Sequence, residues 1–316
     1  MVIAEPLHYA TEAREILATI GPLVDGPFDR AGLLDAVASA QVLVVRLAHQ
    51  IDDEVLAAAP RLRVIASPTT GTDHIDLDAA EARGIRVVTL RGETAFLSSI
   101  RATPEHTWAL LLALARHLPA AAAASHAGPW DRDALRGTEL AGKRLGIFGF
   151  GRVGRIVAAF GAAFEMSVFA YDTAPNPAPG VTMVGSLAEL LEVSDVLLIH
   201  VPLDASTVGA IGAAQLARLP AGALLVNTAR GAIVDEQAVV DALGSGRLAG
   251  AAVDVLDGER VPEALRASPL LLYAGSHPDR AIVTPHIAGA TWESMHRTEV
   301  FLAERLRELV WAGPEL

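Results

Sequence analysis

Gly149-Phe150-Gly151-Arg152-Val153-Gly154 is the stretch that decides the fold. It follows the apolar segment Arg144–Phe148 and opens the amphipathic segment Arg152–Phe164, so a predicted strand runs through three glycines into a predicted helix. In such a turn the first glycine permits the tight bend, the second lets phosphates approach the backbone, and the third lets helix and strand pack closely. The free N–H groups at the start of the helix attract the phosphates. The stretch therefore predicts a dinucleotide-binding α/β unit.

An acidic residue follows the glycines at the distance that such a unit needs. The next predicted strand, Ser167–Tyr171, ends directly before Asp172, about 20 residues further on. A carboxylate at this place accepts hydrogen bonds from ribose hydroxyls and repels a 2′-phosphate. Asp172 therefore predicts NAD rather than NADP as the ligand.

Short apolar strands alternate with amphipathic helices in both directions from the glycines. Further predicted strands are Val42–Val45, Arg63–Ala66, Arg86–Val88, Asp195–Ile199, Ala223–Val226, Ala249–Val253 and Ala281–Val283. Predicted helices are Asp53–Ala58, Asp76–Arg83, Leu187–Leu191, Ala213–Arg218, Glu236–Leu243 and a last one over residues 292–309. Between the two series a helix begins at Pro104, with Thr103 as its predicted N-cap.

This alternation predicts an α/β fold with two doubly wound parallel-sheet domains, joined near residues 95–105. Strands that are apolar along their whole length suit parallel sheets that are covered on both faces. Ligands of such sheets bind at the carboxyl ends of the strands. We therefore expect the active site in a crevice between the two halves.

Composition narrows the class of protein. The chain has 316 residues, of which 52% are hydrophobic and 20% charged, which excludes a disordered chain. Its net charge of −12 argues against binding to nucleic acid or to anionic membranes. The absence of cysteine excludes disulfides, thiolate catalysis and cysteine metal sites. The densest apolar run, residues 107–115, is too short for a membrane span, which needs about 20 residues. We expect a cytoplasmic protein.

Two kinds of side chain follow the predicted strands at the ligand end of the second half. Arg230 follows Ala223–Val226, and a guanidinium grips a carboxylate through two parallel hydrogen bonds. An ordinary surface ion pair is the alternative role for this arginine. His200 and His286 also follow apolar strands, and the spacing of the ten histidines does not choose between them.

The motifs together resemble a known family. Gly149–Gly154, Asp172, Asn227–Glu236, Gly250–Val255 and Thr284–Gly289 occur in this order, as in the D-isomer-specific 2-hydroxyacid dehydrogenases. The resemblance implies a flavodoxin-like substrate-binding domain made of residues 1–100 and a returning C-terminal segment, 288–316. It also implies a Rossmann-like NAD-binding domain at residues 101–287, through which the protein forms a homodimer.

The resemblance assigns a catalytic set of three residues: Arg230, Glu259 and His286. Arg230 would anchor the substrate, and His286, in a Pro-His-x-x-Gly segment, would be the acid and base. Glu259 would hold the imidazole and stabilise its protonated form. Arg260 stands where the family usually has proline, which leaves Asp257 as an alternative partner for His286.

The resemblance also implies a wider set of contacts. NAD would contact Gly149, Gly151, Arg152, Val153, Gly154, Asp172, Thr103, His200, Pro202, Thr207, Thr228, Ala229, Arg230, Asp254, His286 and Gly289. The small anionic substrate would contact Thr70, Gly71, Arg230 and Arg46. Asp254 would bind the nicotinamide carboxamide, with a turn cap as the alternative, and Thr70-Gly71 would bind the carboxylate, with a plain turn as the alternative. No metal is expected.

The function implied is a reversible NAD-dependent oxidation of a D-2-hydroxyacid to a 2-oxoacid. Arg46 and the segment Ala95–Thr103 resemble phosphoglycerate dehydrogenases of the family, although Arg46 equally suits an ordinary strand end. Within the family, a formate dehydrogenase-like enzyme would pair the histidine with glutamine rather than with Glu259. In another class, the same fold serves as an NAD-sensing binding protein of the co-repressor type.

Overall fold

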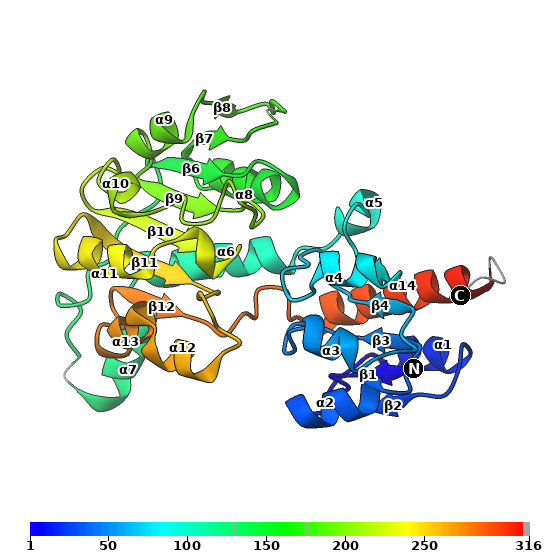
Figure 1. The fold of residues 1–316 in the computed structure, drawn as a ribbon. Coiled ribbons are helices and arrows are strands. Elements are labelled where there is room, and N and C mark those ends of the chain that lie inside the picture. Colours follow the sequence, from blue (N-terminus) through cyan, green and yellow to red (C-terminus); the bar gives the residue numbers. More distant parts are fainter. Residues whose placement is uncertain (129, 175, 312–316) are drawn as a thin grey trace. The chain divides into compact units, whose positions relative to one another are not determined.

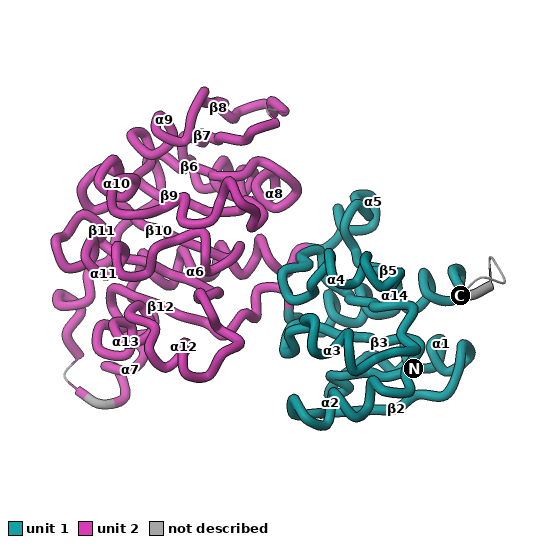
Figure 2. Tube along the Cα trace, viewed as in Figure 1, with its two compact units in different colours: residues 1–100, 290–316 teal, residues 101–289 magenta. Residues whose placement is uncertain are grey.

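The computed structural model describes residues 1–128, 130–174 and 176–311 (Figure 1). It consists of two compact units, shown in Figure 2: unit 1 comprises residues 1–100 and 290–316, and unit 2 comprises residues 101–289. Both sheets are parallel throughout, so the α/β class with two parallel sheets is confirmed. Residues 312–316, the end of the predicted segment 288–316, lie outside the described residues.

The sheet of unit 1 has five strands in the order β2-β1-β3-β4-β5. Its strands are β1 Val2–Ile3, β2 Val24–Asp25, β3 Val42–Val44, β4 Val64–Ala66 and β5 Arg86–Val88. Its helices are α1 Thr11–Ala18, α2 Arg30–Val37, α3 Asp53–Ala57, α4 Leu77–Ala82, α5 Thr94–Leu97 and α14 Trp292–Trp311. The last three strands agree with the sequence prediction to within one residue.

Helix α14 brings the end of the described chain back to unit 1. Its residues Leu302 and Leu306 share a hydrophobic cluster with Leu17 of α1 and with Val44 and Val64 of the sheet. Each of these side chains is at most 2% exposed, so burial of apolar surface holds α14 against α1 and the sheet.

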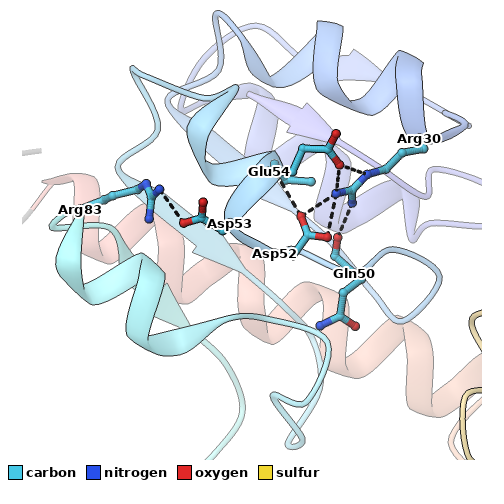
Figure 3. A network of polar contacts seen from close by, with 7 residues as sticks. Arg30, Gln50, Asp52, Asp53, Glu54 and Arg83 are labelled. Atoms are coloured by element: carbon cyan, nitrogen blue, oxygen red, sulfur yellow. Dashed lines mark hydrogen bonds and ion pairs between the residues drawn. The ribbon is translucent and has the colours of Figure 1, made fainter.

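A polar network ties α2 and α4 to α3 (Figure 3). The Arg30 guanidinium donates to Asp52 at 2.5 and 2.7 Å and to Glu54. Asp52 also caps α3 by accepting from the backbone N–H of Val55 at 3.2 Å. On the other side, Arg83 donates to Asp53 at 2.7 Å. Exposed ion pairs contribute little stability each, so the network mainly fixes the direction of α3.

The sheet of unit 2 has seven strands in the order β12-β11-β10-β9-β6-β7-β8. Its strands are β6 Arg144–Phe148, β7 Ser167–Tyr171, β8 Val181–Met183, β9 Val196–Ile199, β10 Ala223–Asn227, β11 Leu248–Val253 and β12 Ala281–Val283. Its helices are α6 Ala102–Ala115, α7 Leu118–Ala127, α8 Arg152–Ala163, α9 Leu187–Glu192, α10 Ala213–Leu216, the 3-10 helix η1 Gly231–Ile233, α11 Glu236–Gly244, α12 Pro262–Ala267 and α13 Pro269–Ser276.

Consecutive strand residues of unit 2 enter different cores. Phe148 and Leu225 belong to one hydrophobic cluster, whereas their neighbours Ile147 and Val226 belong to the other. Both faces of the sheet are therefore buried, which explains why its strands are apolar along their whole length. The strand order changes direction at β6, which lies between β7 and β9, so the loop after β6 stands at a topological switch point.

The start of α6 differs from the sequence prediction. The helix begins at Ala102 and its N-cap is Arg101, so Thr103 does not cap it. Instead the Thr103 carbonyl accepts a hydrogen bond from the Thr107 hydroxyl at 2.9 Å, inside the helix. Arg101 makes no side-chain cap bond, so local capping chemistry does not determine this helix start.

Among the described residues, no single helix has the length and hydropathy to cross a membrane. One pair of consecutive helical segments reaches that length and hydropathy only when taken together, residues 94–115 and 118–126. The chain bends by 59° at the break between them.

Candidate active site

The three glycines of the loop between β6 and α8 meet three different requirements. Gly149 has φ +97°, and a Cβ on it would lie 2.6 Å from the His200 carbonyl carbon. A Cβ on Gly154 would lie 2.2 Å from the Gly149 oxygen. A Cβ on Gly151 would meet nothing within 4 Å. Gly151 is the N-cap of α8, so no capping side chain covers the first N–H groups of the helix. The loop therefore leaves open space and backbone N–H groups at the start of α8, which fits a pyrophosphate.

Asp172 lies beside this loop, at the end of β7. One oxygen of its carboxylate accepts from the Phe150 N–H at 2.7 Å, and the other accepts from the Ala174 N–H at 2.9 Å. These bonds fix an anionic group next to the glycine loop, where a dinucleotide would place its adenosine ribose.

His200 directly follows β9. Burial lowers its pKa to about 3, and its Nε2 is buried without a hydrogen-bond partner. An imidazole with this pKa is uncharged near neutral pH and cannot serve there as a proton donor. The structure thus separates His200 from His286, which the sequence spacing alone did not.

Other predicted cofactor contacts lie around the same edge of unit 2. Thr207 is buried and donates its hydroxyl to the Pro202 carbonyl at 2.7 Å, which closes the loop after β9. Arg152, in the first turn of α8, has its pKa lowered by burial and, to a lesser extent, by the charge of Arg101. Gly289, at the end of unit 2, is exposed.

The ends of β10, β11 and β12 lie side by side, because Asn227 pairs with Val253 and Val253 with Val283. The buried Asn227 side chain donates to the Arg230 carbonyl at 2.9 Å and accepts from the Ala229 N–H at 3.0 Å. These two bonds shape the turn that carries Arg230 out of β10.

Asp254, directly after β11, is fully buried and organises the loop after β12. Its carboxylate accepts from the Thr284 hydroxyl at 2.5 Å and from the N–H groups of Ile287 and Ala288 at 2.9 and 2.7 Å. Its own carbonyl accepts from the His286 N–H at 2.8 Å. His286 has φ +53°, a conformation that a non-glycine residue rarely holds without such support.

Glu259 and His286 meet at this edge. Oε1 of Glu259 is hydrogen-bonded to Nδ1 of His286, and its Oε2 accepts from the Leu256 N–H at 3.1 Å. Burial acts to raise the pKa of Glu259, but the hydrogen bond and charge of His286 outweigh it and hold that pKa below its ordinary value. Asp257, the alternative partner, is exposed, and its backbone N–H donates to Glu236.

Two residues of α6 join the site without having been singled out from the sequence. His106 Nε2 lies 3.1 Å from the Thr284 hydroxyl and 3.3 Å from Asp254. Thr107 shares a hydrogen bond of 2.7 Å with Thr228. The available signal was the polar run Glu105-His106-Thr107 near the start of the helix, which by itself does not indicate a site.

Three predicted substrate residues lie in unit 1 (Figure 2). Thr70 and Gly71 are in the loop after β4, where the Thr69 hydroxyl donates to the Gly71 carbonyl at 2.8 Å. Arg46 follows β3 and forms an ion pair of 2.9 Å with Glu299 of α14. All the other predicted site residues lie in unit 2.

No group of three or more His, Asp or Glu side chains in the described ranges is placed to hold a metal ion.

Residues 108–288 match a protein-family model that is described as "D-isomer specific 2-hydroxyacid dehydrogenase, NAD binding domain". The chain belongs to this family, and unit 2 contains its NAD-binding domain.

Curated relatives and solved structures agree with this assignment. The chain is 41% identical to D-3-phosphoglycerate dehydrogenase of Mycobacterium tuberculosis over 92% of its own length and 52% of that protein. It thus spans about half the length of that relative. It is 34% identical to hydroxypyruvate reductase of Thermotoga maritima, over 87% of this chain and 86% of the relative. The structure of D-lactate dehydrogenase from Aquifex aeolicus, complexed with NAD and lactic acid, superposes with a TM-score of 0.86 at 28% identity, covering 98% and 95% of the two chains.

Proposed function

We propose that the protein is an NAD-dependent dehydrogenase that interconverts a D-2-hydroxyacid and its 2-oxoacid. The observation that carries the proposal is the hydrogen bond between Glu259 and His286 at the carboxyl edge of the NAD-binding sheet, two strands from Arg230. An imidazole held by a carboxylate is a proton donor and acceptor, and a guanidinium recognises a carboxylate next to a carbonyl.

Each residue has a defined role in the reduction of a 2-oxoacid. Bound NADH supplies a hydride for the carbonyl carbon. Arg230 holds the substrate carboxylate and polarises the keto oxygen. Protonated His286 donates its proton to that oxygen and acts as the base in the reverse direction. Glu259 stabilises the imidazolium and fixes the ring, so it acts as a positioning residue.

The surrounding residues support this division of roles. Asp254 positions His286 through the loop after β12, in addition to the proposed contact with the nicotinamide carboxamide. Gly151, the start of α8 and Asp172 would bind the pyrophosphate and ribose, with the other predicted cofactor contacts around them. In unit 1, Thr70 and Gly71 would supply backbone N–H groups to the substrate carboxylate.

The relatives support the reaction class, because phosphoglycerate dehydrogenase, hydroxypyruvate reductase and D-lactate dehydrogenase all act on 2-hydroxyacids or 2-oxoacids. A formate dehydrogenase-like activity is disfavoured by Glu259, which stands where those enzymes carry glutamine. A purely NAD-sensing role would not require the hydrogen-bonded Glu259–His286 pair.

The proposal includes a homodimer formed through the NAD-binding unit. Helix α7 supports it: residues 118–126 are mostly alanine, and none of them is buried. Leu118 is 52% exposed. Apolar surface of this kind is typical of an interface with a second copy. Sedimentation equilibrium should give twice the chain mass, and Leu118→Glu should give the monomer.

The function is tested by following NADH oxidation with a panel of 2-oxoacids: glyoxylate, pyruvate, hydroxypyruvate and its phosphate ester. Saturable turnover of at least one of them is expected. NADH binding without turnover of any 2-oxoacid would favour the NAD-sensing alternative.

A further inference from the structure

We propose that Glu299 is a specificity-determining residue that neutralises Arg46 and makes the enzyme prefer 2-oxoacids with an uncharged side chain over those with a second anionic group. The inference deepens the proposed function and rests on it. It concerns a pocket in unit 1, which we call the Arg46 pocket.

The Arg46 pocket lies at the substrate edge of the sheet of unit 1. Arg46 comes two residues after β3, and the loop with Thr70 and Gly71 follows β4. Strands β3 and β4 are parallel neighbours, so their carboxyl ends meet at one edge of the sheet. We therefore place the side chain of a substrate whose carboxylate lies in that loop in this part of unit 1.

Arg46 is engaged on several sides. Its Nη2 lies 2.9 Å from Oε1 of Glu299. Nη1 and Nη2 donate to the Leu7 carbonyl at 3.2 and 3.3 Å, and the guanidinium lies 5.1 Å from the centre of the Tyr9 ring. The backbone N–H of Arg46 donates to Glu5. The guanidinium is thus held inside unit 1.

Separating the Glu299 carboxylate from Arg46 is energetically unfavourable. Its side chain is 1% exposed, and its second oxygen accepts from the Ala10 N–H at 2.7 Å. A phosphate that approached Arg46 would bring negative charge next to this buried carboxylate, or would strip it of its partner. Both outcomes are unfavourable, because a buried charge without a partner is strongly destabilising.

The rest of the pocket is apolar or carries side chains that already have partners. It has a volume of about 1000 Å³ and contains the apolar side chains of Leu7, Trp292 and Met295. The other arginine that lines it, Arg297, donates to Ser99. The two histidines that line it are engaged as well: His8 packs edge-on against Trp292, and His296 lies 3.3 Å from Glu12. The pocket lining contains two carboxylates, Glu5 and Glu293, and Glu299 adds a third from beneath Arg46, against two arginines. This balance favours an uncharged substituent and opposes a dianionic substrate.

A matched pair of substrates tests the inference. Hydroxypyruvate and its phosphate ester differ only by the phosphate group, so the ratio of their kcat/KM values reports how the protein treats the second charge. Wild type should prefer hydroxypyruvate. Glu299→Gln keeps an oxygen for the Ala10 N–H but removes the charge, so Arg46 becomes available and the ratio should move toward the phosphate ester by about tenfold or more. Glu304→Gln, which removes the charge of a partly exposed glutamate on the same helix, should leave the ratio unchanged.

The double variant Arg46→Gln, Glu299→Gln removes the pair as a unit and leaves no buried charge without a partner. It should have the wild-type ratio, because in wild type the two charges already cancel. A wild-type preference for the phosphate ester, an unchanged ratio in Glu299→Gln, or a tenfold loss of phosphate-ester activity in the double variant would each overturn the inference. Absence of turnover with both substrates would instead refute the proposed function.

Discussion

His286 and Glu259 stand 27 residues apart in the chain, and the side chains share a hydrogen bond. Each is about one-fifth exposed, so the pair is sheltered but reachable by a small substrate. The loop of His286 is in turn fixed by the buried Asp254. The pair and its support all belong to unit 2, and they define where a proton can be exchanged beside the proposed cofactor site.

Replacing His286 should abolish most of the chemistry and spare the binding of NADH. His286→Gln should reduce kcat by about 10²–10⁴-fold, the usual contribution of a general acid. Fluorescence titration with NADH should give a dissociation constant close to that of wild type. His277→Gln, at an exposed histidine of the same unit, is the control and should keep full activity. Wild-type turnover by His286→Gln would remove His286 from the mechanism.

Glu259 should control the pH range of the reaction. Its pKa is held below the ordinary value, so its charge supports the imidazolium at neutral pH and is lost only as the pH falls through that lowered pKa. In Glu259→Gln the side chain carries no charge at any pH, so the loss of activity that protonation of Glu259 causes on the acid side should be absent and the profile should shift. Profiles of kcat/KM against pH measure the shift; superimposable profiles would contradict the assigned role.

Arg230 should matter for every 2-oxoacid, because the carboxylate and the neighbouring carbonyl are common to all. Arg230→Lys keeps the charge but loses the planar fork. The loss of a charge-assisted contact should reduce kcat/KM about 10- to 150-fold for pyruvate and hydroxypyruvate alike. Arg218→Lys, at an exposed pair with Glu192, serves as the control. A loss confined to one substrate would assign Arg230 to the substrate side chain instead.

Asp172 should make NADH a much better ligand than NADPH. Its carboxylate is fixed beside the glycine loop by the Phe150 N–H, where a 2′-phosphate would be repelled. Asp172→Asn removes the charge while keeping one acceptor oxygen, so the two dissociation constants should approach each other. Equal affinities in wild type would refute this role for Asp172.

Asp254→Asn should destabilise unit 2, because an amide offers one acceptor oxygen to a loop that uses two. At least one buried donor loses its partner, at a cost of about 1–3 kcal/mol in the free energy of unfolding. Urea denaturation measures this cost, and Asp241→Asn on the exposed face of α11 is the matched control. Equal stability of the two variants would show that Asp254 does not hold the loop.

Strands and helices could be predicted from the sequence where their local pattern of apolar residues matches the side chains that are buried in the structure. The bounds of β6, β7 and β12 match their predictions, because these strands are apolar runs between turn residues. β1 and β2 were missed, since two residues are too few to show a pattern. The start of α6 at Ala102 was missed because its N-cap, Arg101, has no capping side chain.

The site residues likewise fall into those that a local sequence pattern indicates and those that it does not. The glycine loop and Asp172 lie close in sequence, so spacing alone indicates them. The roles of Glu259 and His286 followed from the resemblance, and the structure adds the hydrogen bond between them. The ion pair of Arg46 with Glu299 joins distant segments and has no local signal. Such contacts depend on how α14 packs on unit 1.

The most direct test of the central claim follows the hydride itself. The protein is supplied with NADH that carries deuterium at the transferable position of C4, together with the 2-oxoacid that it turns over best, and the product is analysed by mass spectrometry and chiral chromatography. Under the proposed mechanism we expect a D-2-hydroxyacid with one deuterium at C2, and loss of this product in His286→Gln. A product without deuterium at C2, or with the L configuration, would contradict it.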